Sequence, residues 1–572
     1  MKLAKTREVW PDQSAASATR PSEGRAGAVL GGAIFSPRIE GLGLSIRPLL
    51  DGDAAAGEAI YHGVFRFAGT EVACRGTVVF DCMPDDAPWR EALHGFAWLA
   101  DIAATGRELH RLHARALVSD WIDGRRHRES PTSLAVAGRR LQSWLTSASY
   151  LCQGATEGFC DSFFASLARQ VRELQRRVLL PGAADRLQAA VGLAHAALGL
   201  RGLETLRPTA FAILGSALDS SVLPDGGHVS RSPQALLRLL LDLLPLRIAC
   251  ESARIELPAA VHGALERMLP MLRFFLHGDG GLAIFQGAGD PKIPACQAVL
   301  AADGVNGRPV AHAVHSGFGR MEGGAAAAVI RLPEIDDPQS EARFQDGLAF
   351  EFSDASDRIV INCGIPALDS PELSSAGRMM EAHSTLTLDG APASGSYSSG
   401  MLGRMLARGT PGRARSLPPR FESSPVGALV EGSRTLQAGS SSLVHHRTLF
   451  LSARGNDLRG EDTLQAHPAR PTAGISFAIR FHLDPTVTAT VSQDGASVML
   501  KTEHAGWRFL ASGAKIGIEE SIRLWGAGGP RKSVQIVLRA DVGVAARVVW
   551  AFKRADRLDL PVVAADDLQL PL

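Results

Sequence analysis

The feature that most constrains the fold is a change of hydrophobic period near residue 276. From about residue 85 to 275, apolar residues recur at helical spacing, as in SLARQVRELQRRVLL and PQALLRLLLDLLPLRIACESA. After this point, short alternating runs such as GLAFEFSD, DRIVINCG and ARVVWAFKR follow one another, separated by Gly, Asp, Asn and Pro turns. The chain is therefore predicted to be an α+β multidomain protein, with a stack of helices followed by an antiparallel β-sandwich.

This pattern divides the chain into three parts. Residues 1–48 are rich in Ser, Gly, Pro and Arg without sustained periodicity, so we expect a flexible N-terminal tail. Residues 49–275 are predicted to form the helical domain and residues 276–572 the β-sandwich domain. Within the sandwich, the Gly-, Ser- and Arg-rich stretch 391–441 is expected to be a long surface loop.

Composition and targeting signals exclude several classes of protein. The 60 basic and 59 acidic residues give a formal net charge of +1, unlike the basic balance of a nucleic-acid-binding protein. No run of about 18 apolar residues predicts a transmembrane helix. The N-terminus lacks the apolar core of roughly 7–15 residues found in secretion signals. The seven scattered cysteines favour free thiols, so the sequence itself predicts a cytoplasmic location.

Candidate binding residues gather where a helix is predicted to begin. Ser232-Pro233 is typical of a helix start, and such a start favours bound anions. Arg231 could therefore pair with a carboxylate, and His228 could act as an acid or base near neutral pH. The alternative is that Asp225 belongs to a simple turn and Ser232 to a cap. Trp98 could likewise be an aromatic binding residue or a core residue.

Several short motifs, in this order along the chain, resemble those of the heparinase II/III family of polysaccharide lyases. The segments that carry the resemblance are 63–69 (GVFRFAG), 94–99 (HGFAWL), 223–233 (LPDGGHVSRSP), 348–352 (LAFEF), 360–364 (VINCG), 382–390 (AHSTLTLDG) and 458–462 (LRGED). They span most of the chain. The resemblance implies an (α/α) toroid of helices joined to a C-terminal antiparallel β-sandwich.

The same resemblance implies β-elimination on an acidic polysaccharide. That chemistry needs a group that neutralises the uronate carboxylate, a base that removes the α-proton, and an acid that protonates the leaving oxygen. The family places a Tyr shortly after the Asp-Gly motif, where this chain has Ala235, and a His-x-His-x-Asp run where it has Ala342 to Asp346. The candidates that remain are His228, Arg231 and Tyr397 as catalytic residues and Asp225 and Trp98 as substrate-binding residues.

A structural zinc is a separate expectation from the resemblance. Relatives bind zinc through His, Asp and His at positions that look like Phe344, Asn362 and His383 in this chain. Cys363 could replace a lost ligand, because thiolates bind zinc well. His383 and Cys363 are therefore the candidate metal ligands, and no other cofactor is required.

Three functional hypotheses follow. The first is a carbon-oxygen lyase acting on an acidic polysaccharide such as heparin, heparan sulfate or alginate. The second is a glycan-binding or envelope-associated protein that has lost the catalytic residues, and the third is hydrolysis of another substrate. Family members are typically bacterial proteins of the periplasm or cell envelope, which opposes the cytoplasmic location predicted from the N-terminus. The polymer, its linkage and the oligomeric state stay open.

Overall fold

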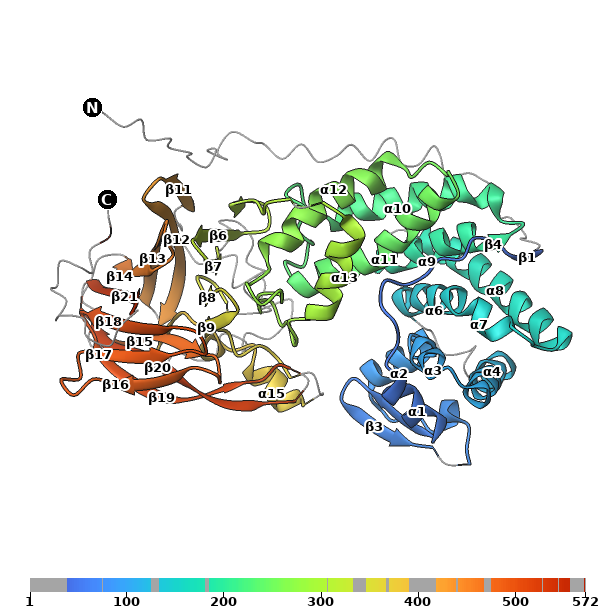
Figure 1. Cartoon of the computed structure of the whole chain (residues 1–572), viewed down its shortest axis with the longest axis horizontal. Helices are drawn as coiled ribbons and strands as arrows, with labels where there is room; N and C mark the ends of the chain where they lie inside the picture. Colours follow the sequence, from blue (N-terminus) through green and yellow to red (C-terminus); the bar gives the residue numbers. More distant parts are fainter. Residues whose placement is uncertain are drawn as a thin grey trace.

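The computed structural model describes residues 39–74, 76–124, 133–180, 185–305, 307–332, 346–366, 370–389, 418–438, 441–467, 475–526, 528–543, 545–555 and 570. Figure 1 shows helices that form an arch, followed along the chain by a domain of two sheets. The predicted order of helices first and sheets second is confirmed. In the described part of the chain, no helix has the length and apolar character needed to cross a membrane.

The arch is built from helices that follow one another along the sequence. They are α1 (Ala54–Tyr61), α2 (Ala87–Gly95), α3 (Leu99–Ala104), α4 (Glu108–Asp123), α6 (Leu134–Thr146), α7 (Ala148–Cys152), α8 (Glu157–Val178), α9 (Arg186–Gly199), α10 (Arg207–Ser221), α11 (Pro233–Ser252), α12 (Ala259–Phe274) and α13 (Ile293–Asp303). Short 3-10 turns are η3 (Val79–Asp81) and η4 (Glu204–Leu206). Their apolar residues form one continuous core.

Local signals explain where several helices begin. Ser133 caps α6 by accepting a hydrogen bond from the Val136 N–H. The predicted start of α11 is also confirmed, since Ser232 accepts a hydrogen bond from the Ala235 N–H and Pro233 is the first helical residue. These caps fix the ends of two helices that carry polar side chains important to the site.

The ends of the helical domain differ from the predicted boundaries. Residues 1–38 lie outside the described residues. Immediately after them, β1 (Gly41–Leu42) pairs with β4 (Leu200–Arg201), and Ile46 is buried, so this stretch is docked on the helices. At the other end, α13 follows residue 275 and buries Cys296 and Val299 in the helical core. A further small hairpin, β2 (Val64–Phe67) with β3 (Thr70–Ala73), packs beside α1 and α2.

The first large sheet has the strand order β19-β20-β15-β9-β8-β7-β6-β5, with β10 also paired to β15. The bounds are β5 (His312–Ala313), β6 (Phe318–Gly323), β7 (Ala326–Arg331), β8 (Phe350–Asp354), β9 (Asp357–Ile361), β10 (Leu386–Leu388), β15 (Ile475–Leu483), β19 (Lys515–Arg523) and β20 (Arg531–Val542). Between β9 and β10 lie α15 (Pro371–Ala376) and the turn η5 (Met380–Ala382).

The second large sheet has the order β11-β12-β13-β14-β21-β18-β17-β16. Its strands are β11 (Arg420–Ser424), β12 (Gly427–Ala438), β13 (Ser441–Ser452), β14 (Asp457–His467), β16 (Thr488–Val491), β17 (Ser497–Lys501), β18 (Gly506–Ser512) and β21 (Ala545–Arg554). Both sheets contribute aromatic side chains to one core, where Phe350 and Phe481 of the first sheet contact Trp550 of the second. The predicted antiparallel sandwich is therefore confirmed.

Charged and polar contacts fasten the helical half to the first sheet. Arg320 on β6 donates to the carbonyls of Phe274 and Leu276 at the end of α12. His277 lies 3.1 Å from the Glu351 carboxylate on β8. Because these partners are buried and each satisfies the other, they hold the two halves in a defined arrangement.

Candidate functional site

The strongest polar cluster of the helical half joins three helices that are otherwise largely apolar. Arg139 of α6 makes a bidentate ion pair with Asp242 of α11, with Nη1 at 2.7 Å from Oδ1 and Nη2 at 3.1 Å from Oδ2. Asp242 is buried, whereas the Arg139 side chain keeps 27% of its surface exposed. The pair is therefore anchored in the core on its acidic side and open to solvent on its basic side.

Two glutamines complete this cluster. Gln142 of α6 donates its amide to Asp242 at 2.9 Å and accepts from Arg139 at 3.0 Å. Gln188, in the first turn of α9, accepts from Arg139 at 2.8 Å and donates to Gln142 at 3.0 Å. Both terminal nitrogens of Arg139 have partners in this chain of contacts, so its guanidinium is held in one orientation. We call Arg139, Gln142, Gln188, Arg238 and Asp242 the inner-helix cluster.

Arg238 differs from the other members of the inner-helix cluster. It lies one turn before Asp242 on α11, and in the described part of the chain it makes no hydrogen bond or close ion pair. Its side chain is exposed, yet burial lowers its pKa, and the neighbouring Arg139 lowers it further. Arg238 is thus a cation that water reaches and that has no close partner in the described residues, so it is available to an anionic ligand.

The close packing that brings these helices together depends on glycine. A Cβ on Gly138 of α6 would lie 2.3 Å from the Gln188 carbonyl oxygen of α9. A Cβ on Gly192 of α9 would lie 2.6 Å from the Gly138 carbonyl oxygen. Only glycine permits this backbone approach, and it places Arg139 within reach of Gln188.

The turn before α11 is a joint between the two halves of the molecule. Asp225, predicted to bind substrate, accepts hydrogen bonds from the Ser316 N–H at 2.6 Å and from the Ser316 hydroxyl at 2.7 Å. It also accepts from the Gly227 N–H, as expected of a turn residue. Its carboxylate is therefore occupied by the joint, and a direct role in substrate binding stays a prediction.

His228 and Arg231 lie just beyond this joint, at the start of α11. The Nδ1 atom of His228 accepts from the Ser230 N–H and lies 2.7 Å from the Ser230 hydroxyl, which leaves the ring proton on Nε2. Burial lowers the pKa of His228 to about 4, so the ring is neutral at physiological pH. Arg231 has a left-handed backbone with φ of 57°, a strained conformation for this residue type. Both are partly exposed, and their catalytic roles stay predictions.

The remaining candidates from the helical half do not join this surface. Trp98 is only 2% exposed and donates its ring N–H to the Leu93 carbonyl, so the structure places it in the core. Of the tyrosines, Tyr61 is on α1 and Tyr150 on α7, away from α11, and burial raises the pKa of Tyr150. Tyr397, the predicted catalytic tyrosine, lies outside the described residues, as does Phe344.

The predicted zinc ligands are both buried in the β half. His383 is 3% exposed, and its Nδ1 donates to the Met379 carbonyl at 2.7 Å. Cys363 contacts His482 at 3.5 Å, and burial raises the pKa of its thiol to about 12, which favours the protonated form over the thiolate that zinc prefers. Neither belongs to a group of three suitable ligands among the described residues. Zinc at this position stays a prediction.

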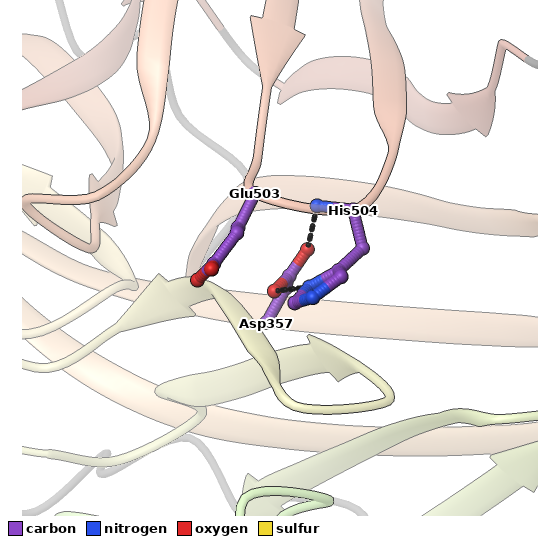
Figure 2. Close-up of side chains that lie close together, drawn as sticks. All are labelled: Asp357, Glu503 and His504. Carbon is purple, nitrogen blue, oxygen red and sulfur yellow. Dashed lines mark hydrogen bonds and ion pairs between the residues drawn. The ribbon is translucent and has the colours of Figure 1, made fainter.

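A different trio in the β half could hold a cation. One ligand atom from each of Asp357, Glu503 and His504 can be chosen so that all lie within 4.8 Å of one another. Figure 2 shows Glu503 and His504 on either side of Asp357. Asp357 accepts from the Thr502 hydroxyl, the His504 N–H and the His504 ring, the last at 2.7 Å. These hydrogen bonds outweigh burial and lower the pKa of Asp357, so its carboxylate is already paired with His504 and Thr502.

A second charged network lies inside the sandwich. Arg447 on β13 forms a bidentate pair with Asp462 on β14, its direct cross-strand neighbour. Asp462 also binds His445 at 2.7 Å and accepts from the Trp550 ring N–H. The side chains of Arg447, His445 and Asp462 are fully buried. Side chains alternate between the two faces of this strand, so His445 is buried and His446 is partly exposed.

Sequence reasoning missed the inner-helix cluster. Its members come from α6, α9 and α11, and nothing local links Arg139 to a partner 103 residues away. One signal was present: Asp242 is the single charged residue within the apolar run LLLDLLPL, and a lone carboxylate on a buried helix face needs a cationic partner. That signal indicates a buried ion pair without naming the arginine.

Two comparisons with known proteins identify relatives of this chain, one through a family model and one through a similar protein. Residues 305–551 match the family model described as Heparinase II/III-like, C-terminal. FtsZ-localized protein C of Caulobacter vibrioides is 32% identical over 555 residues, which cover 91% of this chain and 92% of the relative.

Solved structures show the same fold at low sequence identity. The structure of heparinase III matches with a TM-score of 0.68 at 13% identity, over 91% of this chain and 88% of that one. A mutant of heparan sulfate lyase HepC from Pedobacter heparinus matches with a TM-score of 0.60 at 15% identity, over 89% and 84%. Because the family model matches the β half and the relative is similar over most of its length, we conclude that this chain belongs to the heparinase II/III family.

Proposed function

We propose that this protein binds an acidic polysaccharide on the surface around Arg238. The observation that carries the proposal is the arrangement of two guanidinium groups, Arg139 and Arg238, around one buried carboxylate, Asp242. The cluster keeps one net positive charge, and the second arginine has no close protein partner in the described residues. A ligand carboxylate or sulfate would supply that partner.

The chemistry of the side chains favours a carboxylate or sulfate group. A guanidinium presents parallel N–H donors that match two oxygens of such a group. Gln188 and Arg139 bind each other in the same cluster, and each is partly exposed. Solved relatives named as heparan sulfate lyases support a uronate- and sulfate-bearing polymer as the ligand class.

Titration with defined polymers tests the proposal. Heparan sulfate, heparin, alginate and hyaluronate would be titrated into the full chain by calorimetry, with neutral dextran as the uncharged control. We expect saturable binding of at least one acidic polymer that weakens as salt rises, because part of the attraction is between charges. Arg238→Ala should weaken it by roughly tenfold or more, and Arg238→Lys by less, since lysine keeps the charge but loses the paired donors.

The matched control is Arg176→Ala, which removes an exposed arginine at the end of α8. It should bind the polymer as the unmodified chain does. Equal weakening by Arg176→Ala and Arg238→Ala would reduce the effect to overall charge and contradict a defined site. Failure of all four acidic polymers to bind would contradict the proposed ligand class.

A second candidate function is β-elimination of the bound polymer, and His228 favours it. Its ring is neutral near pH 7 and partly exposed, so Nδ1 or Nε2 could exchange a proton with a bound uronate after local rearrangement. The same four polymers, incubated with the protein, would be followed for the ultraviolet absorbance of unsaturated uronate ends. An increase in this absorbance would establish elimination, and its loss in His228→Ala would establish the role of His228. Binding without turnover would leave the protein as a glycan-binding member of the family.

The named relative suggests where the protein acts. Because FtsZ-localized protein C is similar over nearly its whole length, we propose that this chain also localizes with FtsZ. A fluorescent fusion expressed in Caulobacter vibrioides beside labelled FtsZ would test this. Bands that coincide with FtsZ support the proposal, whereas recovery of the fusion in the periplasmic fraction would contradict it.

A further inference from the structure

A pocket in the helical half has walls from elements that do not carry the inner-helix cluster. It has a volume of about 380 Å³ and lies between α1, α4 and residues 76–78. Its wall includes Tyr61, Thr77, Val78, His113, Leu117 and Asp120. The volume suits a monosaccharide-sized ligand, and the mixture of apolar, aromatic and polar groups is typical of a small-molecule site.

Two polar groups in this wall, the Asp120 carboxylate and the Nε2 atom of His113, receive no hydrogen bond from the described residues. The Asp120 carboxylate accepts no hydrogen bond and makes no close ion pair in the described part of the chain, and His113 is the one nearby group that lowers its pKa. Burial raises its pKa, and the nearby Asp123 raises it further, as expected of a carboxylate that lacks a cation. A cationic group placed beside Asp120 would relieve both effects.

The second unsatisfied group is the Nε2 atom of His113, which is buried and has no hydrogen-bond partner among the described residues. Burial lowers the pKa of this imidazole, so it is neutral, and a hydrogen bond to the Ile60 backbone acts in the opposite direction. Since Nε2 has no partner, that bond uses Nδ1 as the donor, which leaves Nε2 as an acceptor. An unpaired buried acceptor costs free energy that a ligand donor would recover.

The two acceptors are separated along one face of the same helix. His113 and Asp120 are seven residues apart on α4, or about 10 Å along its axis. One ammonium group cannot serve both, so the fitting ligand carries two kinds of donor several ångströms apart. Tyr61 adds an aromatic surface, since its ring stacks on the buried His110 at 4.0 Å and itself remains half-buried at the pocket.

We propose that this pocket binds a small hydroxylated amine of the amino-sugar class. The ammonium group pairs with Asp120, a hydroxyl group donates toward His113, and the ring lies against Tyr61. The site is separate from the polysaccharide surface around Arg238, because its walls are α1 and α4 rather than α6, α9 and α11.

Glucosamine is the probe, with glucose and N-acetylglucosamine as analogues that lack the positive charge. Binding to the full chain would be measured by calorimetry and by saturation-transfer NMR. We expect glucosamine to bind with a Kd on the order of 1 mM and both analogues to bind roughly tenfold more weakly, since they lose the charge-assisted hydrogen bond. Asp120→Asn should weaken glucosamine binding by a similar factor and leave glucose binding unchanged. Tyr61→Leu should weaken all three sugars.

The matched control is Asp219→Asn, which removes an exposed carboxylate on α10 and should leave glucosamine binding unchanged. Circular dichroism and the unfolding temperature would establish that each variant folds, and Asp120→Ser replaces Asp120→Asn if the latter does not. Equal binding of glucosamine and glucose, full binding by a folded Asp120 variant, or no saturable glucosamine binding would each overturn the proposal. None of these outcomes bears on binding of acidic polysaccharide at Arg238.

Discussion

The two arginine–aspartate pairs of this molecule have the same bidentate geometry and opposite surroundings. Arg139 and Asp242 join two helices, and Arg139 reaches solvent beside a second arginine. Arg447 and Asp462 join two neighbouring strands, and both side chains are fully buried. The shared geometry shows that a bidentate pair alone does not indicate a binding site. What separates the two is whether a guanidinium keeps donors that a ligand can reach.

The buried pair also uses most of its remaining hydrogen-bonding capacity within the protein. Arg447 donates to the carbonyls of Leu348 and Ser384, and Asp462 accepts from His445 and Trp550. Such a network organises the sandwich interior and leaves nothing for a ligand. The open pair, in contrast, lies beside Arg238, whose own donors have no close partner in the described residues.

The largest expected effect is on stability, from Arg447→Ala. Removing the guanidinium leaves the Asp462 carboxylate buried without its cation and takes a donor from two other acceptors, the carbonyls of Leu348 and Ser384, so unfolding should become easier by about 3–5 kcal/mol. Denaturant titration followed by circular dichroism would measure it. Arg539→Ala, which removes an exposed arginine paired with Glu519, is the control and should cost less than about 1 kcal/mol. Equal losses would remove the distinction between open and buried pairs.

The next effect is a dependence of stability on pH that originates in buried histidines. Burial lowers the pKa of His195 to about 4, so the folded protein keeps this ring neutral while the unfolded chain takes up a proton below about pH 6.5. Stability should therefore fall by about 2–3 kcal/mol for this residue as pH drops from 6.5 to 4. His195→Leu should flatten the slope in that window, measured by denaturant titration at each pH.

His262→Gln, which removes an exposed imidazole, is the matched control for this measurement. His445 and His482 have pKa values lowered by burial in the same direction, to about 4 and about 3, so a slope will remain in the His195 variant. An unchanged slope in His195→Leu would show that this ring does not contribute to the acid sensitivity.

Gly138→Ala is expected to have a smaller effect on stability. It should also weaken ligand binding at the inner-helix cluster. The added methyl would meet the α9 backbone at 2.3 Å, so α6 and α9 must separate and Arg139 must shift from Gln188. We expect a loss of about 1–3 kcal/mol in stability together with several-fold weaker polysaccharide binding. Gly158→Ala on α8 is the control, because no atom lies within 4 Å of the added Cβ and alanine favours the helix. Normal polysaccharide binding by a folded Gly138→Ala variant would show that the helix contact does not position the site.

The sequence predicted the fold well because its signals are local. Helical and alternating periods, a Ser-Pro helix start and the turn at Asp225 depend on residues within a few positions of one another. The partners of the charged residues were not predictable in this way. Ser316 is 91 residues from Asp225 and Arg139 is 103 from Asp242, and the register that sets Arg447 opposite Asp462 depends on two whole strands. The site is therefore a property of packing that periodicity does not encode.

The smallest expected effect on stability comes from an exposed ion pair, which can be compared with the buried pair on the same strand, β14. Glu461 and Asp462 are neighbours on β14, so their side chains point to opposite faces, and each binds an arginine with two hydrogen bonds. Arg547, the partner of Glu461, is 61% exposed, so water replaces its contacts when it is removed. Arg547→Ala should therefore change the free energy of unfolding by less than about 1 kcal/mol, against several for Arg447→Ala. A loss comparable to that of Arg447→Ala, measured by the same denaturant titration, would mean that the ion pair itself stabilises this sheet, whatever its exposure.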